Sequence, residues 1–280
     1  MIARELISPK SIVVVGASEN TKKPGGKVLA NILSHDFEGE VYAVNPKASE
    51  IQGVPSYCAV ENLPETELAI LAVPADTCVN AVHTLAEKKS TKGFIILSAG
   101  FSEESEEGAR LENEIVETVE KVGGSLIGPN CIGVLTPQYS GVFTTPVPSL
   151  DAKGCDFISG SGATAVFIME SGIPNGLTFS QVFSVGNSAQ LGVEEVLEYL
   201  DETFDPKTSS RVKLLYIESI SDPQKLLQHA RSLRRKGCRI AAVKAGSSAA
   251  GSRAASSHTG ALASSDTAVD ALFRKAGIVR

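Results

Sequence analysis

Short runs of apolar, mostly β-branched residues alternate with segments of helical length along this chain of 280 residues. Such runs predict strands buried on both faces, because a strand with one wet face would alternate apolar and polar residues. A parallel sheet covered by helices on both sides buries its strands in this way, so the pattern predicts an α/β fold. In the first half of the chain the predicted strands are residues 12–15, 41–44, 68–73, 94–97 and 125–127.

The alternation is interrupted once, so we expect two domains. Residues 144–149 contain Pro146 and Pro148, which cannot donate to a central sheet ladder. We therefore predict a doubly wound domain over residues 1–143 and a second parallel α/β domain over residues 144–280. The clearest predicted helix, residues 103–122, has an acidic start that suits the positive end of a helix dipole. Residues 277–280 begin another strand, so we expect the complete protein to continue into a third domain.

Charge and cysteine content exclude several classes of protein. The chain has 26 Lys and Arg against 32 Asp and Glu, a net charge of −6, so no overall basic field favours nucleic acid or an anionic membrane. No stretch has the roughly 18–20 consecutive apolar residues of a membrane-spanning helix. Five scattered cysteines form no CxxC pair, which argues against a disulfide framework or a metal site and favours a reducing, cytoplasmic setting.

A glycine turn follows the first predicted strand, where nucleotides bind in doubly wound folds. Gly16 stands in Val-Val-Val-Gly-Ala-Ser, without the further glycines of a dinucleotide fingerprint. The second strand ends in Asn45-Pro46-Lys47 and offers a cation where a ribose-binding carboxylate is expected. This favours a phosphate-rich, nucleotide-like ligand over a nicotinamide cofactor, although a plain tight turn stays open on this segment alone.

Two glycine- and serine-rich segments of the second half could handle phosphate. Residues 159–164 join a predicted strand to a predicted helix. Free N–H groups at the start of a helix bind anions, so this segment could bind phosphate. A capping turn without a ligand is the alternative. His258 lies among small residues that leave room for phosphate, and a neutral imidazole is a good nucleophile toward phosphorus. The nearest predicted orienting carboxylate is Glu218, at the end of a strand. His35, His83 and His229 are interpreted as surface or helix residues.

Five short segments in order resemble the CoA-binding domain of nucleoside-diphosphate-forming acyl-CoA synthetases, the superfamily of succinyl-CoA synthetase. They are VVVGAS, VNPK, AVPA, SAGF and GPNC-x-G, at residues 13–18, 44–47, 72–75, 98–101 and 128–133. The resemblance implies a Rossmann-like CoA-binding domain followed by a flavodoxin-like parallel α/β domain. It also implies a set of CoA-contacting residues: Gly16, Ala17, Ser18 and Glu19 at the CoA phosphates, Lys47 pairing with a phosphate, Leu97, Ser98 and Ala99 flanking the adenine or pantetheine, and Asn130 near the thiol. Cys131 is interpreted as a buried small residue.

The SHTGALA segment at residues 257–263 resembles the phosphohistidine loop of ADP-forming acetyl-CoA synthetases. This resemblance implies that His258 is the phosphorylated nucleophile and that Glu218 orients it. It implies that Ser161, Gly162 and Ala163 donate hydrogen bonds to the phosphate. Gly160 stands in place of a usual Gln in that loop, which bears on the phosphate geometry more than on the reaction class.

The implied reaction is acyl-CoA + ADP + phosphate ⇌ carboxylate + CoA + ATP, with acetate or another short acid as substrate. Its nucleotide and Mg²⁺ would sit on an ATP-grasp domain or β subunit, because no ATP-grasp signature occurs in this sequence, and we expect an oligomer. The alternatives left open are a CoA- or acyl-CoA-binding regulatory module without ligase activity and, less favoured, a nicotinamide oxidoreductase. ADP and GDP are not distinguished.

Overall fold

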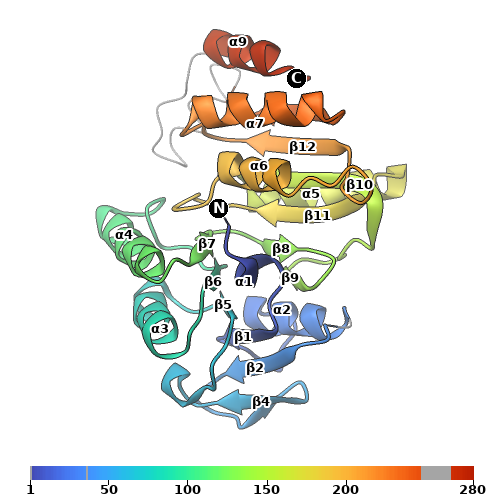
Figure 1. Cartoon of the computed structure of the whole chain (residues 1–280). Helices are drawn as coiled ribbons and strands as arrows, with labels where there is room; N and C mark the ends of the chain where they lie inside the picture. The colour runs from blue at the N-terminus through green and yellow to red at the C-terminus, as the bar shows by residue number, and fades with distance from the viewer. Residues whose placement is uncertain (1, 36, 247–265) are drawn as a thin grey trace.

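The computed structural model describes residues 2–35, 37–246 and 266–280. They form two sheets with helices on their faces, one above the other in Figure 1. The predicted His258 loop lies outside the described residues. No helix in the described ranges is long and apolar enough to cross a membrane.

The first sheet has seven strands in the order β3-β4-β2-β1-β5-β6-β7, parallel except for the β3–β4 pair. Its strands are β1 (Ser11–Val15), β2 (Glu40–Val44), β3 (Glu50–Ile51), β4 (Val54–Tyr57), β5 (Leu68–Leu71), β6 (Gly93–Ile96) and β7 (Ser125–Ile127). Its helices are α1 (Arg4–Ile7), α2 (Pro24–Leu33), α3 (Ala75–Lys88) and α4 (Glu106–Lys121), with a 3₁₀ turn, η1 (Val60–Asn62). The predicted strands of this domain are confirmed, while β3 and β4 were not predicted.

Burial on both faces explains why the central strand reads as an unbroken apolar run. Ile12 and Val14 of β1 pack into one core cluster with α1 and α2, whereas Val13 and Val15 pack into another with α3 and α4. Because neighbouring side chains of a strand point to opposite faces, each of the four must be apolar.

Helix α4 begins three residues later than the acidic run predicts. Ser105 is its N-cap, and the Ser105 side chain accepts a hydrogen bond from Gly108 N. Serine caps a helix by satisfying a free backbone N–H. Glu103 therefore lies in the preceding loop and is available to other partners.

The second sheet has the order β13-β12-β10-β11-β8-β9. Its strands are β8 (Gly133–Leu135), β9 (Ser140–Val142), β10 (Leu150–Ser159), β11 (Phe179–Ser184), β12 (Val212–Ile217) and β13 (Arg239–Lys244). Its helices are α5 (Gly162–Gly172), α6 (Val193–Glu202), α7 (Pro223–Arg235) and α9 (Asp266–Ala276), with a 3₁₀ turn, η2 (Ile173–Asn175). Side chains of α5 pack on one face of this sheet, and those of α6, α7 and α9 pack in the cluster on the other.

The second sheet contains two antiparallel strands that were not predicted, while the predicted strands of residues 144–280 are parallel. Strands β10 to β13 are parallel, but β8 pairs antiparallel with β11 and with β9. Both antiparallel strands precede the proline-rich linker, so the sheets divide between β7 and β8 although residues 133–142 lie within the predicted first domain. The boundary at residue 143 stays a prediction for the domains as folding units.

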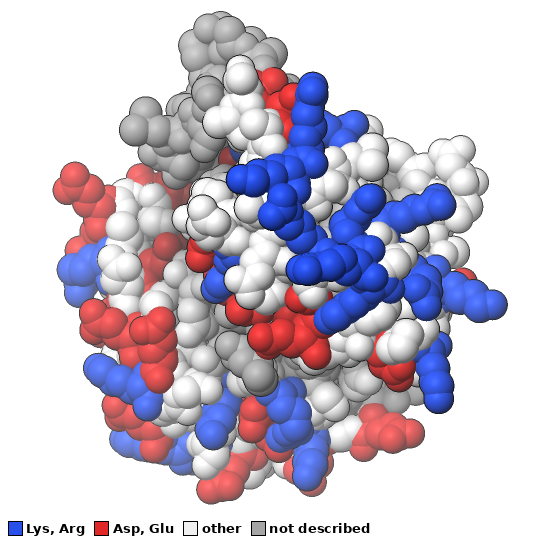
Figure 2. Space-filling view, turned by 45° about the horizontal axis from the view of Figure 1, so that its top comes forward, with Lys and Arg blue, Asp and Glu red and all other residues white. Residues whose placement is uncertain are grey.

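Positive charge is unevenly distributed over this acidic chain. Figure 2 shows Lys and Arg gathered over the upper half of the face in view. The last turns of α7 and α9, which lie in the upper part of Figure 1, carry Arg234, Arg235, Arg274 and Lys275. A local basic patch thus coexists with the net charge of −6.

Candidate functional site

The carboxyl ends of the parallel strands β1, β2 and β5 bring the first group of predicted site residues together. Gly16 follows β1 and donates from its N to Val44 O at 3.0 Å, at the end of β2. Its φ is +86°, and an added Cβ would lie 2.5 Å from Ala72 O, beyond β5. Only glycine fits this turn without strain. Strand β1 lies between β2 and β5, and the strands that follow it in the chain are added first on the β2 side and then on the β5 side. Gly16 therefore lies at the topological switch point, where such folds bind ligands.

Lys47 lies beside this turn, two residues beyond Asn45. Asn45 Oδ1 accepts from Lys47 N at 2.9 Å, and Asn45 Nδ2 donates to Ala17 O at 2.8 Å, so one side chain ties the two strand ends together. Lys47 is exposed, which leaves its ammonium accessible to a phosphate.

Glu19 and Ser18 are held by Gln52, a residue that sequence reasoning missed. Gln52 N donates to Glu19 Oε1, and Gln52 Nε2 donates to Ser18 O and Gly26 O, each at 2.8 Å. Ala17 is buried. These contacts fix the backbone of the turn, and they give the Glu19 carboxylate a structural partner within the chain.

The second group of predicted residues lines a cavity of about 660 Å³ between the two sheets. Leu97, just after β6, lines it from the first domain, and Asn130 lines it from the connection between β7 and β8. The α5 loop and Glu218 line it from the second domain. Six predicted site residues line this cavity: Leu97, Asn130, Ser161, Gly162, Ala163 and Glu218. Ser98 accepts from Asn130 N through its carbonyl at 2.9 Å, and Ala99 is exposed beside it. None of Gly16, Ala17, Ser18, Glu19 and Lys47 lines this cavity, so the predicted residues fall into two places.

The N-terminus of α5 faces the cavity. Ser161 is the N-cap, and its Oγ accepts from Thr164 N at 3.3 Å. The N–H groups of Gly162 and Ala163 belong to the first helical turn, which has no intrahelical acceptors. An added Cβ on Gly162 would lie 2.9 Å from Ile132 Cγ2, so glycine lets the helix start close to the chain that leaves the first domain. The geometry suits an anion.

Glu218 follows β12, the neighbour of β10, and therefore lies next to the Gly160 loop. A Cβ on Gly160 would lie 3.7 Å from Glu218 Cγ. Buried Lys244 donates from Nζ to Glu218 O at 2.9 Å and to Ala245 O at 2.7 Å. Burial lowers the pKa of Lys244, opposed by the nearby Glu218 charge.

Glu194, also missed from the sequence, lines the same cavity and is only 3% exposed. Its Oε1 accepts from Ser221 N at 2.7 Å and Asp222 N at 3.2 Å, so it holds the loop that follows Glu218. Burial raises the pKa of Glu194. No local pattern marked it, because α6 carries acidic residues on its exposed side as well.

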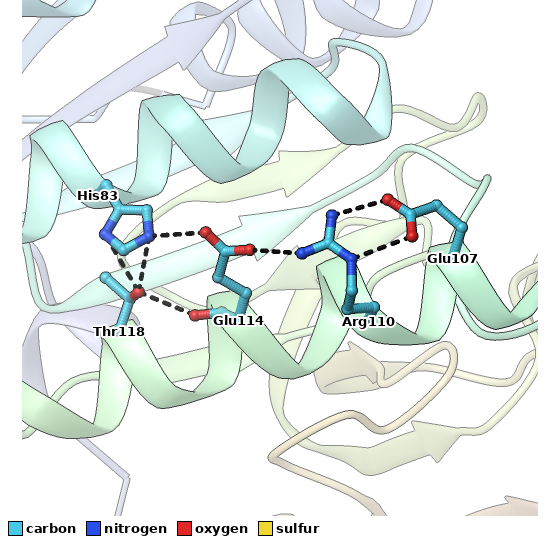
Figure 3. Close-up of polar contacts among 5 residues, drawn as sticks. All are labelled: His83, Glu107, Arg110, Glu114 and Thr118. Carbon is cyan, nitrogen blue, oxygen red and sulfur yellow. Dashed lines mark hydrogen bonds and ion pairs between the residues drawn. The ribbon is translucent and has the colours of Figure 1, made fainter.

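Cys131, His83 and His229 are held by contacts within the chain. Cys131 is buried, donates weakly to Ile96 O at 3.3 Å, and has its thiol pKa raised by burial to about 12. His83 lies between α3 and α4 and contacts Glu114 at 3.2 Å and Thr118 (Figure 3). His229 is buried, with Nδ1 2.9 Å from Asp201 Oδ2. The interpretation of Cys131 as a buried small residue is confirmed, and His229 is more buried than predicted.

Both halves of the chain match known families. Residues 10–137 match the model of a CoA binding domain, and residues 152–280 match that of a succinyl-CoA ligase like flavodoxin domain. The chain is 40% identical over 275 residues to acetate–CoA ligase (ADP-forming) I of Archaeoglobus fulgidus, covering 98% of this chain and 39% of that protein. It is 38% identical to the α subunit of acetate–CoA ligase (ADP-forming) II of Pyrococcus furiosus, covering 97% and 58%.

The chain belongs to the ADP-forming acyl-CoA synthetase family. The fold agrees: dinucleotide forming acetyl-coenzyme A synthetase 1 of Candidatus Korarchaeum cryptofilum, solved with phosphate and ADP, superimposes with a TM-score of 0.88 at 31% identity, covering 99% of this chain and 58% of that one. The family fold of a Rossmann-like and a flavodoxin-like domain is thereby confirmed. The chain spans 39% to 58% of the lengths of these relatives.

Proposed function

We propose that this chain is the CoA-binding and phosphohistidine-bearing part of an ADP-forming acyl-CoA synthetase. One observation carries the proposal: a single cavity between the sheets is lined by Leu97, expected beside the adenine or pantetheine, by Asn130, expected near the thiol, and by the α5 loop and Glu218, expected at the phosphate. A thioester and a phosphate bound at these positions would meet inside the cavity. The names of the relatives support the same reaction.

CoA would lie along the carboxyl edge of the first sheet. Gly16, Ala17, Ser18 and Glu19 would follow its phosphates, with Lys47 supplying the opposite charge. Leu97, Ser98 and Ala99 would flank the pantetheine or adenine, and Asn130 would lie near the thiol. The glycine-only turn at Gly16 supports this placement, because it allows the backbone to approach a ligand closely.

The chemistry would proceed in three transfers. A phosphate oxygen attacks the thioester carbonyl, the C–S bond breaks, and CoA leaves with acyl phosphate remaining. His258 then attacks phosphorus, the P–O bond to the acyl group breaks, and the carboxylate is released. Phosphohistidine finally gives its phosphoryl group to ADP. Donors at Ser161, Gly162 and Ala163 would stabilise the phosphoryl charge, since such transfers are catalysed mainly by positioning and electrostatics. Glu218 would orient the imidazole.

The nucleotide and Mg²⁺ would bind on an ATP-grasp domain or β subunit, and the assembly would be an oligomer. The Pyrococcus furiosus relative is named as an α subunit, which supports a partner. A cytoplasmic location is part of the proposal, since all five cysteines are free and four of them are buried.

The proposal is tested by incubating the complete enzyme with labelled ATP and Mg²⁺. The wild type should acquire acid-labile label on this chain, and His258→Ala should acquire none. Label persisting in His258→Ala would assign the nucleophile elsewhere. CoA binding without any phosphoenzyme in the wild type would favour the alternative, a regulatory CoA-binding module, and tighter binding of NADH than of CoA would favour an oxidoreductase.

A further inference from the structure

Asn187 lies where the loops of both domains meet the connection between them. It stands in the turn between β11 and α6, and its backbone N donates to Pro129 O at 2.9 Å. At the preceding Gly186, whose φ is +57°, an added Cβ would lie 2.1 Å from Pro129 O. The turn is therefore pressed against residues 128–131, and Asn187 and Asn130 both line the cavity.

The Asn187 side chain reaches the first domain and meets two carboxylates there. Its Nδ2 donates to Glu103 Oε2, in the loop before α4, and to Glu112 Oε2 of α4 at 3.0 Å. An ionised carboxylate only accepts hydrogen bonds, so both N–H hydrogens of the amide are directed at these two groups. Ser102 Oγ, 3.3 Å from the same nitrogen, itself donates to Glu112.

The two carboxylates thus fix the orientation of the amide. With Nδ2 turned to Glu103 and Glu112, the Asn187 Oδ1 is left to accept, and it accepts from Asn130 Nδ2 at 3.4 Å. Asn130 has a left-handed backbone with φ of +57° and is anchored by its N to Ser98 O. The nitrogen end of the Asn130 amide faces Asn187, and its carbonyl oxygen is the end left for another partner.

The Glu103 carboxylate carries the negative charge that allows it to accept these hydrogen bonds. Desolvation pushes the pKa of Glu103 upward, but hydrogen bonds from Asn187, Gly100 N at 2.7 Å and Phe101 N at 3.4 Å outweigh it, and the pKa lies below its usual value. Glu103 is therefore ionised at neutral pH. Two carboxylates bound to one nitrogen repel each other, and the amide hydrogens between them offset that repulsion.

We propose that Asn187 is a positioning residue that fixes the Asn130 amide for the reacting end of acyl-CoA, using Glu103 and Glu112 as its anchors. The inference rests on the proposed function. Because Asn130 is expected at the thiol end, away from the CoA phosphates, loss of Asn187 should slow acyl transfer while leaving CoA affinity within about threefold.

The test uses the complete enzyme with its partner and acetyl-CoA, ADP and phosphate as the probe. Asn187→Asp keeps the shape but faces Glu103 and Glu112 with a third carboxylate. It should lower kcat about tenfold at pH 8, a loss of about 1.4 kcal/mol, and the deficit should shrink toward pH 6, where one of the three carboxyls regains a proton that can be donated. The titratable groups facing this site are Glu103 from its loop and Glu112 from α4, with Glu194 and Glu218 on the opposite cavity wall.

A reciprocal exchange separates positioning from general damage. In Glu103→Gln with Asn187→Asp, the new amide can donate to the new carboxylate, so kcat at pH 8 should recover to within about threefold of wild type. Asn175→Asp makes the same chemical change on the exposed η2 turn and should leave the pH profile unchanged.

Different outcomes would overturn the proposed function and the positioning role of Asn187. A wild type that forms no phosphoenzyme would sink the proposed function itself. A working wild type with an Asn187→Asp deficit that is equal at pH 6 and pH 8, or with no rescue in the double variant, would overturn the positioning role. A wild-type kcat in Asn187→Ala would overturn it as well.

Discussion

Single residues at the ends of strands form the proposed CoA site. The Gly16 turn leaves no room for a Cβ, because Ala72 O and Val73 Cγ1 would lie 2.5 and 2.7 Å from it. The lack of a side chain therefore matters twice, for the positive φ and for close packing against the end of β5.

Gly16→Val should remove most CoA binding while the second domain keeps its structure. The added side chain must push apart the ends of β1 and β5, where the CoA phosphates are proposed to lie. Isothermal titration with CoA should show at least about a tenfold rise in Kd, which corresponds to about 1.4 kcal/mol. Gly53→Ala is the matched control, since nothing lies within 4 Å of its Cβ position. Its φ of +82° makes a modest loss of stability the expected result there, with CoA affinity retained.

Lys47→Ala should weaken CoA binding by about three- to tenfold at low salt and by less at high salt. An exposed ammonium near a phosphate contributes a screened charge interaction. Lys10, a lysine that none of the proposed CoA contacts includes, provides the control in Lys10→Ala. Equal Kd values for the Lys47 variant and wild type at low salt would remove Lys47 from the CoA site.

At the scale of elements, α6 and α7 are joined by contacts of the buried Asp201 carboxylate. Asp201 Oδ2 lies 2.9 Å from His229 Nδ1, and its Oδ1 lies 2.8 Å from Lys236 Nζ. Desolvation alone would raise the pKa of Asp201, but hydrogen bonds from Lys236 and His229 more than compensate and lower it.

Asp201→Ala should therefore destabilise the protein by about 1.5–3 kcal/mol at neutral pH, the range for hydrogen bonds to charged groups. The folded pKa of Asp201 is below its unfolded value near 3.9, so its contribution is full above that value and is lost as pH falls through the folded pKa. Urea unfolding at pH 7 and near pH 3 measures this. A difference from wild type that does not shrink in acid would argue against the charge assignment.

The elements also show what the sequence can and cannot predict. Strands β1, β5 and β6 are interior strands, and burial on both faces makes each a continuous apolar run that is visible locally. Strand β4 contains Pro55, and β9 reads Ser-Gly-Val, so neither carries such a run. Their pairing depends on partners elsewhere in the chain, as β8 depends on β11.

The residues of the candidate site divide in the same way into local and long-range features. The glycine turn and the α5 loop were predicted because their residue types are unusual where they stand. Asn187 depends on Glu103 and Glu112, which are 84 and 75 residues away, and Glu194 depends on the loop after β12. Contacts over such separations leave no local pattern, so the geometry of the cavity had to come from the fold.

At the scale of the whole molecule, the β8–β9 hairpin ties the two sheets together. Its strand β8 pairs with β11, yet Tyr139 Oη donates to Leu6 O at 2.7 Å and Asn31 Nδ2 donates to Val142 O at 2.6 Å. Leu6 and Asn31 belong to α1 and α2 of the first domain. One core cluster accordingly includes residues of both domains.

We expect the described chain to unfold in one cooperative calorimetric transition, because breaking either sheet exposes this shared core. Asn31→Ala should lower the temperature of that single transition without splitting it, by a loss of about 1–3 kcal/mol from two buried carbonyls left without a donor. Two separate transitions in the wild type would show that the hairpin does not couple the domains.

The hairpin also bears on how such chains can be recombined. A crossover placed in the proline-rich stretch, the most inviting position in the sequence, would carry β8 and β9 away from β11 and leave an apolar sheet edge open. A crossover between β7 and β8 would keep the second sheet whole, but it would cut through the wall that holds Asn130. Exchange of CoA-binding units among relatives should therefore succeed only when the β8–β9 hairpin and β11 come from the same parent, so a transferred segment that carries the hairpin should extend through β11 to residue 184.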